Sequence, residues 1–294
     1  MLPDNCTSGT MSGKVTDAVT GDNMSGVGLW WANGMNKDYY IDYPAFKYFG
    51  SVDSNGAWSL TKDAGFYTIN TWKSGYYDEY VNVFACGDQP DQNTSMSDFL
   101  NEGEMRIILR WPKTSPETGT DLDSHLQIPD NDSSTFHVYY PNPQHQTFYY
   151  ATNTYTCGSC SSDQLSDNVT LDKDHNQYST TASPPGDETI TISKVRSGTY
   201  SFSVHNFTNM DNSSNYKTNL RQSRAKVKVF YCPLGTDCNC NACPAAGSLV
   251  KKKFHVPNQN GTLWKVFTFS TSGSGSGFTR EREMTYQSSS HNVY

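Results

Sequence analysis

The sequence predicts an all-β chain made of two tandem β-sandwich domains and a C-terminal extension strand. Helical periodicity is almost absent, whereas short alternating runs of apolar and polar residues recur between Gly, Asn, Asp and Pro. The chain contains 19 Tyr, 14 Phe and 6 Trp, an aromatic content that suits pleated sheets and is too high for a disordered chain. Its 294 residues exceed the roughly 100–200 residues of one typical domain.

The charge and hydropathy of the chain exclude some classes of function. A net charge of -7 excludes nucleic-acid binding, which needs clustered Lys and Arg to neutralise phosphates. The one basic run, Lys251-Lys252-Lys253, lies in an alternating stretch and is typical of a solvated strand face. No apolar run approaches the roughly 20 residues of a membrane span. The N-terminus MLPDNC lacks the features of a signal peptide, so we expect a mature or truncated chain.

Strands of the first domain are predicted at residues 11–15, 27–31, 57–61, 66–72 and 80–84. The segments Ser54-Asn55-Gly56 and Lys73-Ser74-Gly75 are turn signals between them. The order GKVTDAVTG, SGVGLWW, SVDSNGAWSL and AGFYTINTWKSGYYDEYVNV resembles carboxypeptidase regulatory-like domains and the B-type repeats of bacterial collagen adhesins. This resemblance implies an immunoglobulin-like sandwich over residues 1–86 that acts as a rigid spacer.

Residues 87–103 are polar and rich in turn formers, which predicts a linker. A second sandwich is then predicted over residues 104–270. Its expected strands are residues 105–111, 122–128, 135–140, 147–151, 188–193, 199–205, 225–232, 249–256 and 263–269.

The second domain resembles the YfaP-like family of secreted bacterial and algal proteins. The matching segments, in the order of the family, are RIILRW, DLDSHLQIPD, LDKDHN, GDETITIS, SGTYSFSVHNF, AKVKVFY, FHVP and LWKVFTF. The chain departs from the family at residues 147–169 and 232–247, where it inserts cysteine-bearing loops. Because the family has no well-established activity, the resemblance implies a fold more than a function.

Residues 271–294 form a tail beyond the last strand that the second domain needs. The segment STSGSGSG is a flexible tether, and FTREREMTY after it alternates like a strand. One face of that strand is predicted to carry Phe278, Arg280, Arg282, Met284 and Tyr286. We expect it to add to the sheet edge of a neighbouring copy, which would make the chain the subunit of a fibre. Docking of the tail on its own domain is the alternative.

Carboxylates gather at the ends of predicted strands in the second domain. Strand alternation sends Leu122 and Leu126 to one face and Asp121, Asp123 and His125 to the other. The family resemblance adds that both Asp-x-Asp motifs lie at matching positions. A hard cation would relieve the repulsion, so Ca²⁺ binding is predicted, with solvated acidic loops as the alternative. The predicted ligands are Asp121, Asp123, Asp172, Asp174, Asp187 and Glu188.

The 8 cysteines favour disulfides and an oxidising, extracellular or cell-surface compartment. Cys6 and Cys86 flank the first domain, and a bridge between them is the simplest pairing. The others are Cys157, Cys160, Cys232, Cys238, Cys240 and Cys243. We expect three disulfides among them, with their connectivity open. The alternative is a zinc ion held by the Cys157-x-x-Cys160 and Cys240-x-x-Cys243 units.

Sequons for N-glycosylation start at Asn5, Asn23, Asn93, Asn131, Asn168, Asn206, Asn212 and Asn260. They predict a glycoprotein if the source is a secretory eukaryote. The histidines form no HExxH pair, and no Gly-x-Ser-x-Gly elbow occurs, so we do not expect an enzyme.

Two functions follow from these features. The first is an extracellular structural protein that polymerises with copies of itself. The second is a secreted carbohydrate-binding or adhesion module, in which exposed aromatic rings stack on a glycan. The candidate rings are Trp30, Trp31, Trp58, Trp72 and the pairs Tyr139-Tyr140 and Tyr149-Tyr150.

Overall fold

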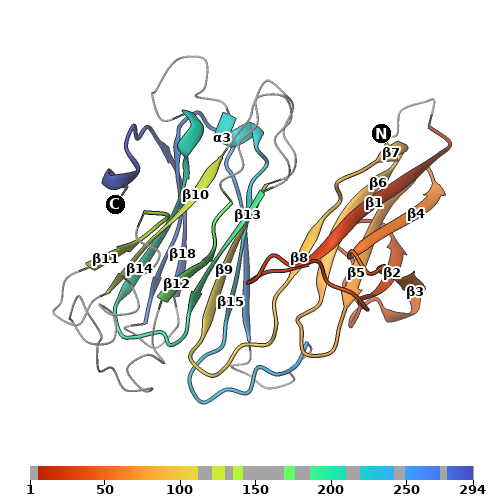
Figure 1. Cartoon of the computed structure of the whole chain (residues 1–294), viewed down its shortest axis with the longest axis horizontal. Coiled ribbons are helices and arrows are strands. Elements are labelled where there is room, and N and C mark those ends of the chain that lie inside the picture. Colours follow the sequence, from red (N-terminus) through yellow and green to blue (C-terminus); the bar gives the residue numbers. More distant parts are fainter. Residues whose placement is uncertain are drawn as a thin grey trace. The chain divides into compact units, whose positions relative to one another are not determined.

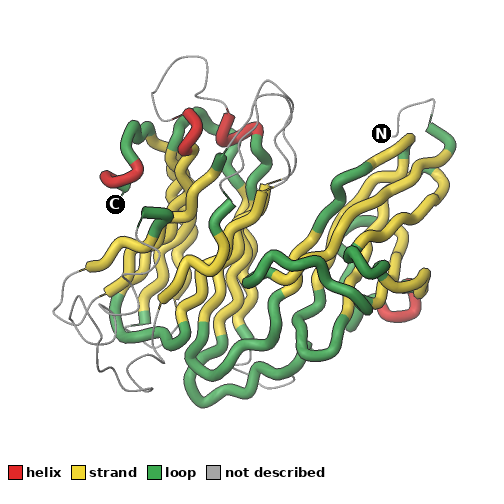
Figure 2. The backbone as a smooth tube through the Cα atoms, viewed as in Figure 1, coloured by secondary structure: helices red, strands yellow, loops and turns green. Residues whose placement is uncertain are grey.

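The computed structural model describes residues 6–111, 121–129, 135–141, 169–175, 186–209, 219–241, 249–271 and 277–293. Their regular secondary structure is β-strand apart from a few short helical turns, and loops join the strands (Figure 2). It divides into two compact units, Met1–Phe99 with Cys238–Ala245 and Leu100–Asp237 with Ala246–Tyr294. Each is an immunoglobulin-like β-sandwich, which confirms the predicted fold class. No helix among these residues is long and apolar enough to cross a membrane.

The first domain packs two sheets face to face (Figure 1). In one sheet, β1 (Ser8–Asp17) runs antiparallel to β4 (Ala57–Asp63) and parallel to β7 (Gly87–Gln89) and β8 (Thr94–Met96). The other sheet is antiparallel, in the order β3 (Lys47–Ser51), β2 (Gly28–Asn33), β5 (Gly65–Trp72) and β6 (Glu79–Ala85).

The core of the first domain follows from strand alternation. Met11 and Val15 of β1 are buried against Leu29 and Ile69 of the opposite sheet. The predicted turn before β4 is confirmed, since Gly56 has φ +72° and a Cβ there would lie 2.5 Å from the carbonyl oxygen of Val15. Only glycine fits both conditions.

The predicted linker at residues 87–103 is wrong for its first part. Residues 87–96 contain β7 and β8, both of which pair with β1, and Met96 is fully buried in the first core. Two glycines of β1 allow this close approach. A Cβ on Gly9 would lie 2.3 Å from the backbone nitrogen of Cys86, and one on Gly13 would lie 2.3 Å from the carbonyl oxygen of Gln92. The first domain therefore extends to Phe99.

The second domain is a larger sandwich of two five-stranded sheets, all antiparallel (Figure 1). One sheet has the order β12 (Val169–Lys173), β13 (Gly186–Ile192), β9 (Met105–Trp111), β15 (Lys226–Tyr231) and β16 (Val250–His255). The other has the order β11 (Thr135–Val138), β10 (Leu122–Pro129), β14 (Thr199–Asn206), β17 (Leu263–Ser270) and β18 (Gly277–Thr285).

Most predicted strands of the second domain form within a few residues of their expected bounds. Strand β12 was not predicted, and the expected strand at residues 147–151 lies outside the described residues. The core between the sheets is rich in rings, with Trp111, Trp264, Phe202, Phe267 and Phe269 almost fully buried. Each ring excludes a large apolar area from water, so this core stabilises the domain strongly.

Candidate functional site

The predicted acidic site forms in part, where β10 of one sheet approaches β13 of the opposite sheet. As predicted, Leu122 and Leu126 enter the core. Glu188 on β13 reaches β10, where its Oε2 atom accepts a 2.6 Å hydrogen bond from the backbone N–H of Ser124. Asp121, Asp123 and Glu188 are 8%, 4% and 1% exposed. Three carboxylates thus lie buried in one region.

Burial and mutual repulsion disfavour the charged forms of these groups. Burial, followed by the charge of Asp174, raises the pKa of Asp121 to about 6. Burial, then Asp121 and Asp174, raises the pKa of Asp123 to about 8. The pKa of Glu188 lies well above its ordinary value because of burial, then Asp123 and Asp174. Four of the six predicted ligands therefore influence one another electrostatically.

The other two predicted ligands behave differently. Asp187 cannot share a face with Glu188, because consecutive residues of a strand point to opposite sides. Its Oδ1 atom forms a 2.7 Å ion pair with Nζ of Lys173 instead. Asp172 lies at a register shift of β12, between Leu171 and Lys173.

The acidic groups offer oxygens to a hard cation without forming a finished cage. Buried Oδ1 of Asp121, Oδ2 of Asp123 and Oε1 of Glu188 have no hydrogen-bond partner among the described residues. Oxygen atoms of this kind are the ligands that Ca²⁺ prefers. Yet the described part of the chain holds no group of three acidic, His or Cys side chains placed so that they could bind a metal ion. Calcium binding stays a prediction that requires these carboxylates to draw closer.

A histidine cluster that sequence analysis missed lies on the outer side of β10, β11 and β14. Nδ1 of His125 is 2.9 Å from Nε2 of His137, and the ring centroids of His125 and His205 are 5.6 Å apart. The ring of Tyr139 stacks on His137 at 4.0 Å. Burial lowers the pKa of His137 to about 4, assisted by the charge of His291, so the cluster is neutral at pH 7. Alternation along each strand could have indicated the shared face, but the pairing of the strands could not be read from the sequence.

Aromatic rings cover the outer face of the β3–β2–β5 sheet in the first domain. We call the set the aromatic face. It consists of Trp30, Tyr39, Tyr40, Tyr43, Tyr48 and Trp72. The ring of Trp30 lies on Gly28, where a Cβ would come within 2.7 Å of it. Its centroid is 5.1 Å from Tyr48 and 6.4 Å from Trp72.

The aromatic face is open to solvent. Tyr43 is 62% exposed, Tyr48 59%, Tyr40 46% and Trp72 44%. Its partly buried member Tyr39 is 5.2 Å from Tyr43 and 5.8 Å from Trp30, measured between ring centroids. The rings therefore form one contiguous exposed surface, which isolated surface aromatics do not.

The other predicted stacking rings do not contribute to this surface. Trp58 is 6% exposed and packs in the first core. Trp31 faces the opposite side of β2, under Nζ of Lys62 at 3.8 Å. Tyr139 is 4% exposed within the histidine cluster. Tyr149 and Tyr150 lie outside the described residues.

The cysteines support the disulfide interpretation. Cys6 and Cys86 are bonded, which confirms the predicted bridge across the ends of the first domain. Cys232, Cys238 and Cys240 are disulfide-bonded as well, and no described cysteine is free. The zinc alternative required the thiolate of Cys240, so it is wrong. Cys157, Cys160 and Cys243 lie outside the described residues.

The sequons differ in their accessibility. Asn23 and Asn260 are exposed, and Asn93 is half-buried. Asn206 is 0% exposed at the end of β14, so the prediction of a glycan there is wrong: the folded domain leaves no room for it. Asn5, Asn131, Asn168 and Asn212 lie outside the described residues.

The predicted extension strand exists as β18, but it pairs with β17 of the same chain. Donation of this strand to a neighbouring copy is therefore not what the folded single chain shows. Phe278 and Met284 pack against the core of their own domain, which explains the self-docking. Tyr286 follows the strand and is 49% exposed.

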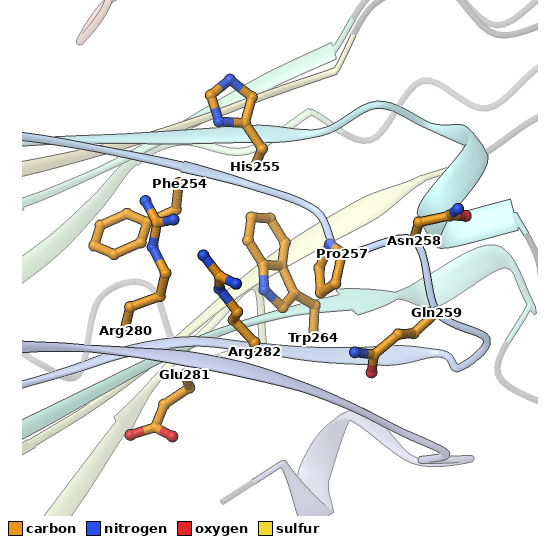
Figure 3. Close-up of a pocket in the computed structure, with 9 residues that line it drawn as sticks. All are labelled: Phe254, His255, Pro257, Asn258, Gln259, Trp264, Arg280, Glu281 and Arg282. Carbon is orange, nitrogen blue, oxygen red and sulfur yellow. The ribbon is translucent and has the colours of Figure 1, made fainter.

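A pocket opens between the edge strands β16 and β18 of the second domain (Figure 3). Its cavity has a volume of about 370 Å³. The lining residues are Phe254, His255, Pro257, Asn258, Gln259, Trp264, Arg280, Glu281 and Arg282. The two arginines were predicted on the same face as Phe278 and Met284, and the pocket is where that face opens to solvent.

Comparison with known proteins gives weak likenesses. No family model and no curated protein matches the chain. The major pilin SpaD of Corynebacterium diphtheriae is 11% identical, with 84% of this chain and 64% of that one covered and a TM-score of 0.25. The major pilin subunit BcpA of Bacillus cereus is 10% identical, with 93% of this chain and 92% of that one covered and a TM-score of 0.25. A Bacteroides uniformis protein, provisionally assigned as carbohydrate binding, is 11% identical, with 67% of this chain and 88% of that one covered and a TM-score of 0.24. Scores this low transfer neither fold details nor activity to this chain.

Proposed function

We propose that this chain is a secreted carbohydrate-binding protein that contacts its ligand through the aromatic face of the first domain. One observation carries the proposal: Trp30, Tyr48 and Trp72 meet on an exposed sheet face, with further tyrosines beside them. Soluble proteins rarely expose large contiguous apolar patches unless a ligand or partner covers them. The disulfides support secretion, because they persist in oxidising compartments.

The chemistry around the aromatic face suits a saccharide. A pyranose ring has apolar faces, which can lie on aromatic rings, and a rim of hydroxyls, which need hydrogen-bond partners. Tyr48 already bonds Ser51 through its hydroxyl group at 3.0 Å. Tyr40 offers a second phenol hydroxyl, protonated at neutral pH as any tyrosine is, and burial followed by the charge of Asp78 raises its pKa further. Aromatic walls with a few polar groups at their edges are typical of small-molecule sites.

The proposal is tested with a panel of neutral hexasaccharides, for example cellohexaose, xylohexaose, mannohexaose and maltohexaose. Isothermal titration calorimetry of the full chain should detect one of them, and Trp72→Ala should weaken its binding at least about tenfold, as loss of a hot-spot ring does. Trp72 is largely outside the core, so the variant should melt close to the wild type.

Phe66→Ala is the matched control. Phe66 is also an exposed ring of β5, 44% accessible, but it pairs with Phe84 and not with the aromatic face. It should bind as the wild type does. Wild-type affinity in Trp72→Ala, or no binding to any member of a broad glycan panel, would disprove saccharide binding at this face.

A second candidate function is the fibre subunit, assembled by exchange of β18 between copies. The observation that favours it is the edge position of this strand: β18 pairs with β17 alone, none of its residues is fully buried, and a Gly/Ser-rich segment precedes it. Exchange of an identical element is a low-cost route to assembly.

A disulfide lock between β17 and β18 tests the fibre. Thr268 and Thr279 are register partners, so Thr268→Cys with Thr279→Cys can fix β18 to its own β17. Light scattering of concentrated solutions should show polymers for the wild type and for a Thr268→Ser/Thr279→Ser control, and monomers for the locked protein. Polymers formed by the locked protein, or a wild type that stays monomeric at all concentrations, rule out strand exchange.

A further inference from the structure

The pocket between β16 and β18 holds two arginines, Arg280 and Arg282, that form no ion pair with any described residue, and the buried Trp264 lies at its base. Arg280 lies opposite Phe267 in the strand register, so it takes the inner face of β18. Arg280 and Arg282 both extend from β18 on the side of Trp264, whereas Glu281 points the other way (Figure 3). The inner face of β18 is therefore positively charged at Arg280 and Arg282, beyond the part of the face that packs against the core.

Arg280 is held in place by its neighbours. Its Nη2 donates a 2.8 Å hydrogen bond to the carbonyl oxygen of Lys253, and its guanidinium carbon lies 5.3 Å from the ring centroid of Phe254. Neither contact neutralises its charge. A guanidinium that is already positioned loses little conformational entropy when it binds an anion.

The nearby carboxylates of β18 are engaged on its other face. Glu283 pairs with Nζ of Lys265 at 3.3 Å, and Oε1 of Glu281 is 3.4 Å from the hydroxyl of Thr268. No ion pair is formed by Arg280 or Arg282 within the described residues. In a chain of net charge -7, this pocket is a local concentration of uncompensated positive charge.

The titration of neighbouring groups reflects that charge. Burial, followed by the positive charges of Lys226, Lys253 and Arg280, lowers the pKa of His255. Burial, followed by Lys253, Arg110 and Arg224, lowers the pKa of Lys226. Cations here repel one another, so an anion bound among them would be stabilised by all of them.

We propose that this pocket binds an acidic saccharide, a sugar ring that carries a carboxylate or a sulfate ester. The planar fork of a guanidinium matches either anion with paired hydrogen bonds. Pro257 supplies apolar surface for the ring above the buried Trp264, and the side-chain amides of Asn258 and Gln259 can both donate and accept at its hydroxyls. A cavity of about 370 Å³ is of the size that small-molecule sites have, and suits one or two sugar rings.

This site is independent of the aromatic face, since it lies in the other domain and selects for negative charge. Calorimetry on the full chain compares a galacturonate oligosaccharide, a sulfated disaccharide, a neutral oligosaccharide of equal length and inorganic sulfate. We expect one acidic sugar to bind, with an affinity that falls as salt rises, and the pKa of His255, followed by NMR, to rise on binding. Which of the two acidic sugars binds distinguishes a carboxylate from a sulfate site.

Variants connect this binding to the pocket. Arg282→Gln removes one charge from an exposed strand position and should weaken binding at least about tenfold, the usual effect of losing a charged hydrogen-bond donor. Arg282→Lys keeps the charge and loses the planar guanidinium, so its affinity should lie between those of the wild type and Arg282→Gln. Lys14→Gln removes the same charge from an exposed site in the first domain and should bind like the wild type.

Several results would overturn the proposal. They are equal binding of neutral and acidic sugars, wild-type affinity in Arg282→Gln, or inorganic sulfate bound as tightly as the acidic sugar. A Trp72→Ala variant that binds the acidic sugar normally is expected, so failure of the aromatic-face proposal leaves this one standing.

Discussion

The first domain holds its distinctive side chains on the surface, whereas the second domain buries them. Trp and Tyr rings of the aromatic face stand on an outer sheet face, and only a modest core lies beneath. The second domain encloses a far larger core and, at its margins, buries like groups together: the carboxylates Asp121, Asp123 and Glu188, and the histidines of β10, β11 and β14. The contrast teaches that ligands should change the first domain little, while protons and cations should change the stability of the second.

Loss of the Cys6–Cys86 disulfide should have the largest effect, confined to the first domain. The bridge spans 80 residues of sequence, and chain-entropy estimates give about 4 kcal/mol for a loop of that length. Hydrogen exchange of Cys6→Ser/Cys86→Ser should therefore accelerate about a thousandfold in β1 and β6 and stay unchanged in β14 and β17. Equal acceleration in both domains would contradict their independence.

Asp123→Asn should abolish the stabilisation of the second domain by calcium. Without calcium at pH 8, the variant should be more stable than the wild type by about 1–3 kcal/mol, because an amide avoids the burial of an unpaired charge. With calcium, thermal melting should rise for the wild type and not for the variant. Asp187→Asn, which breaks the pair with Lys173, is the control and should keep the calcium response. An unchanged wild-type melting temperature in excess EDTA would contradict calcium binding at these carboxylates.

His137→Gln should reduce the loss of folding stability between pH 6.5 and pH 4, an effect smaller than the two above. The pKa of His137 is lowered from 6.5 to about 4, so the unfolded chain binds the proton more tightly. Stability is then full above pH 6.5 and is lost as pH falls toward 4, by about 1 kcal/mol after allowance for solvent screening. Urea unfolding at both pH values measures it. The titratable groups that contact this ring or influence its charge among the described residues include His125, Tyr139 and His291. A loss of the same size in wild type and variant would assign the acid sensitivity to those groups.

The sequence predicted most of the strands that carry side-chain alternation, β12 excepted, and missed β7 and β8, whose pairing rests on the backbone. β7 and β8 are polar and short, and they were assigned to a linker. Their partner strand holds the signal in retrospect: Gly9 and Gly13 lack the Cβ atoms that would block residues 86–93. Close backbone approach is a tertiary contact, so the glycines indicate it only when the neighbour is known.

The acidic site was predictable as far as alternation along a single strand allows. Asp121 and Asp123 were placed correctly, and the period of two already excludes Asp187 and Glu188 from one common face. Which sheet lies opposite β10, and hence that Glu188 meets Ser124, depends on the packing of the two sheets. The arginines of β18 were placed on the inner face, but only the space beside β16 makes that face a pocket.

The lysines of β16 have a consequence for the behaviour of the protein in concentrated solution. Among the described strands, β16 ends one sheet and β18 ends the other, so each presents backbone groups along an open border. Exposed edge strands can pair with strands of other molecules and so start aggregation, unless charged side chains repel the approaching molecule. Lys251, Lys252 and Lys253 are all exposed on β16, and every approaching copy carries the same three charges. The run thus acts as a guard against unwanted aggregation, and a protein with threonines in its place should turn cloudy on storage while the natural one stays clear.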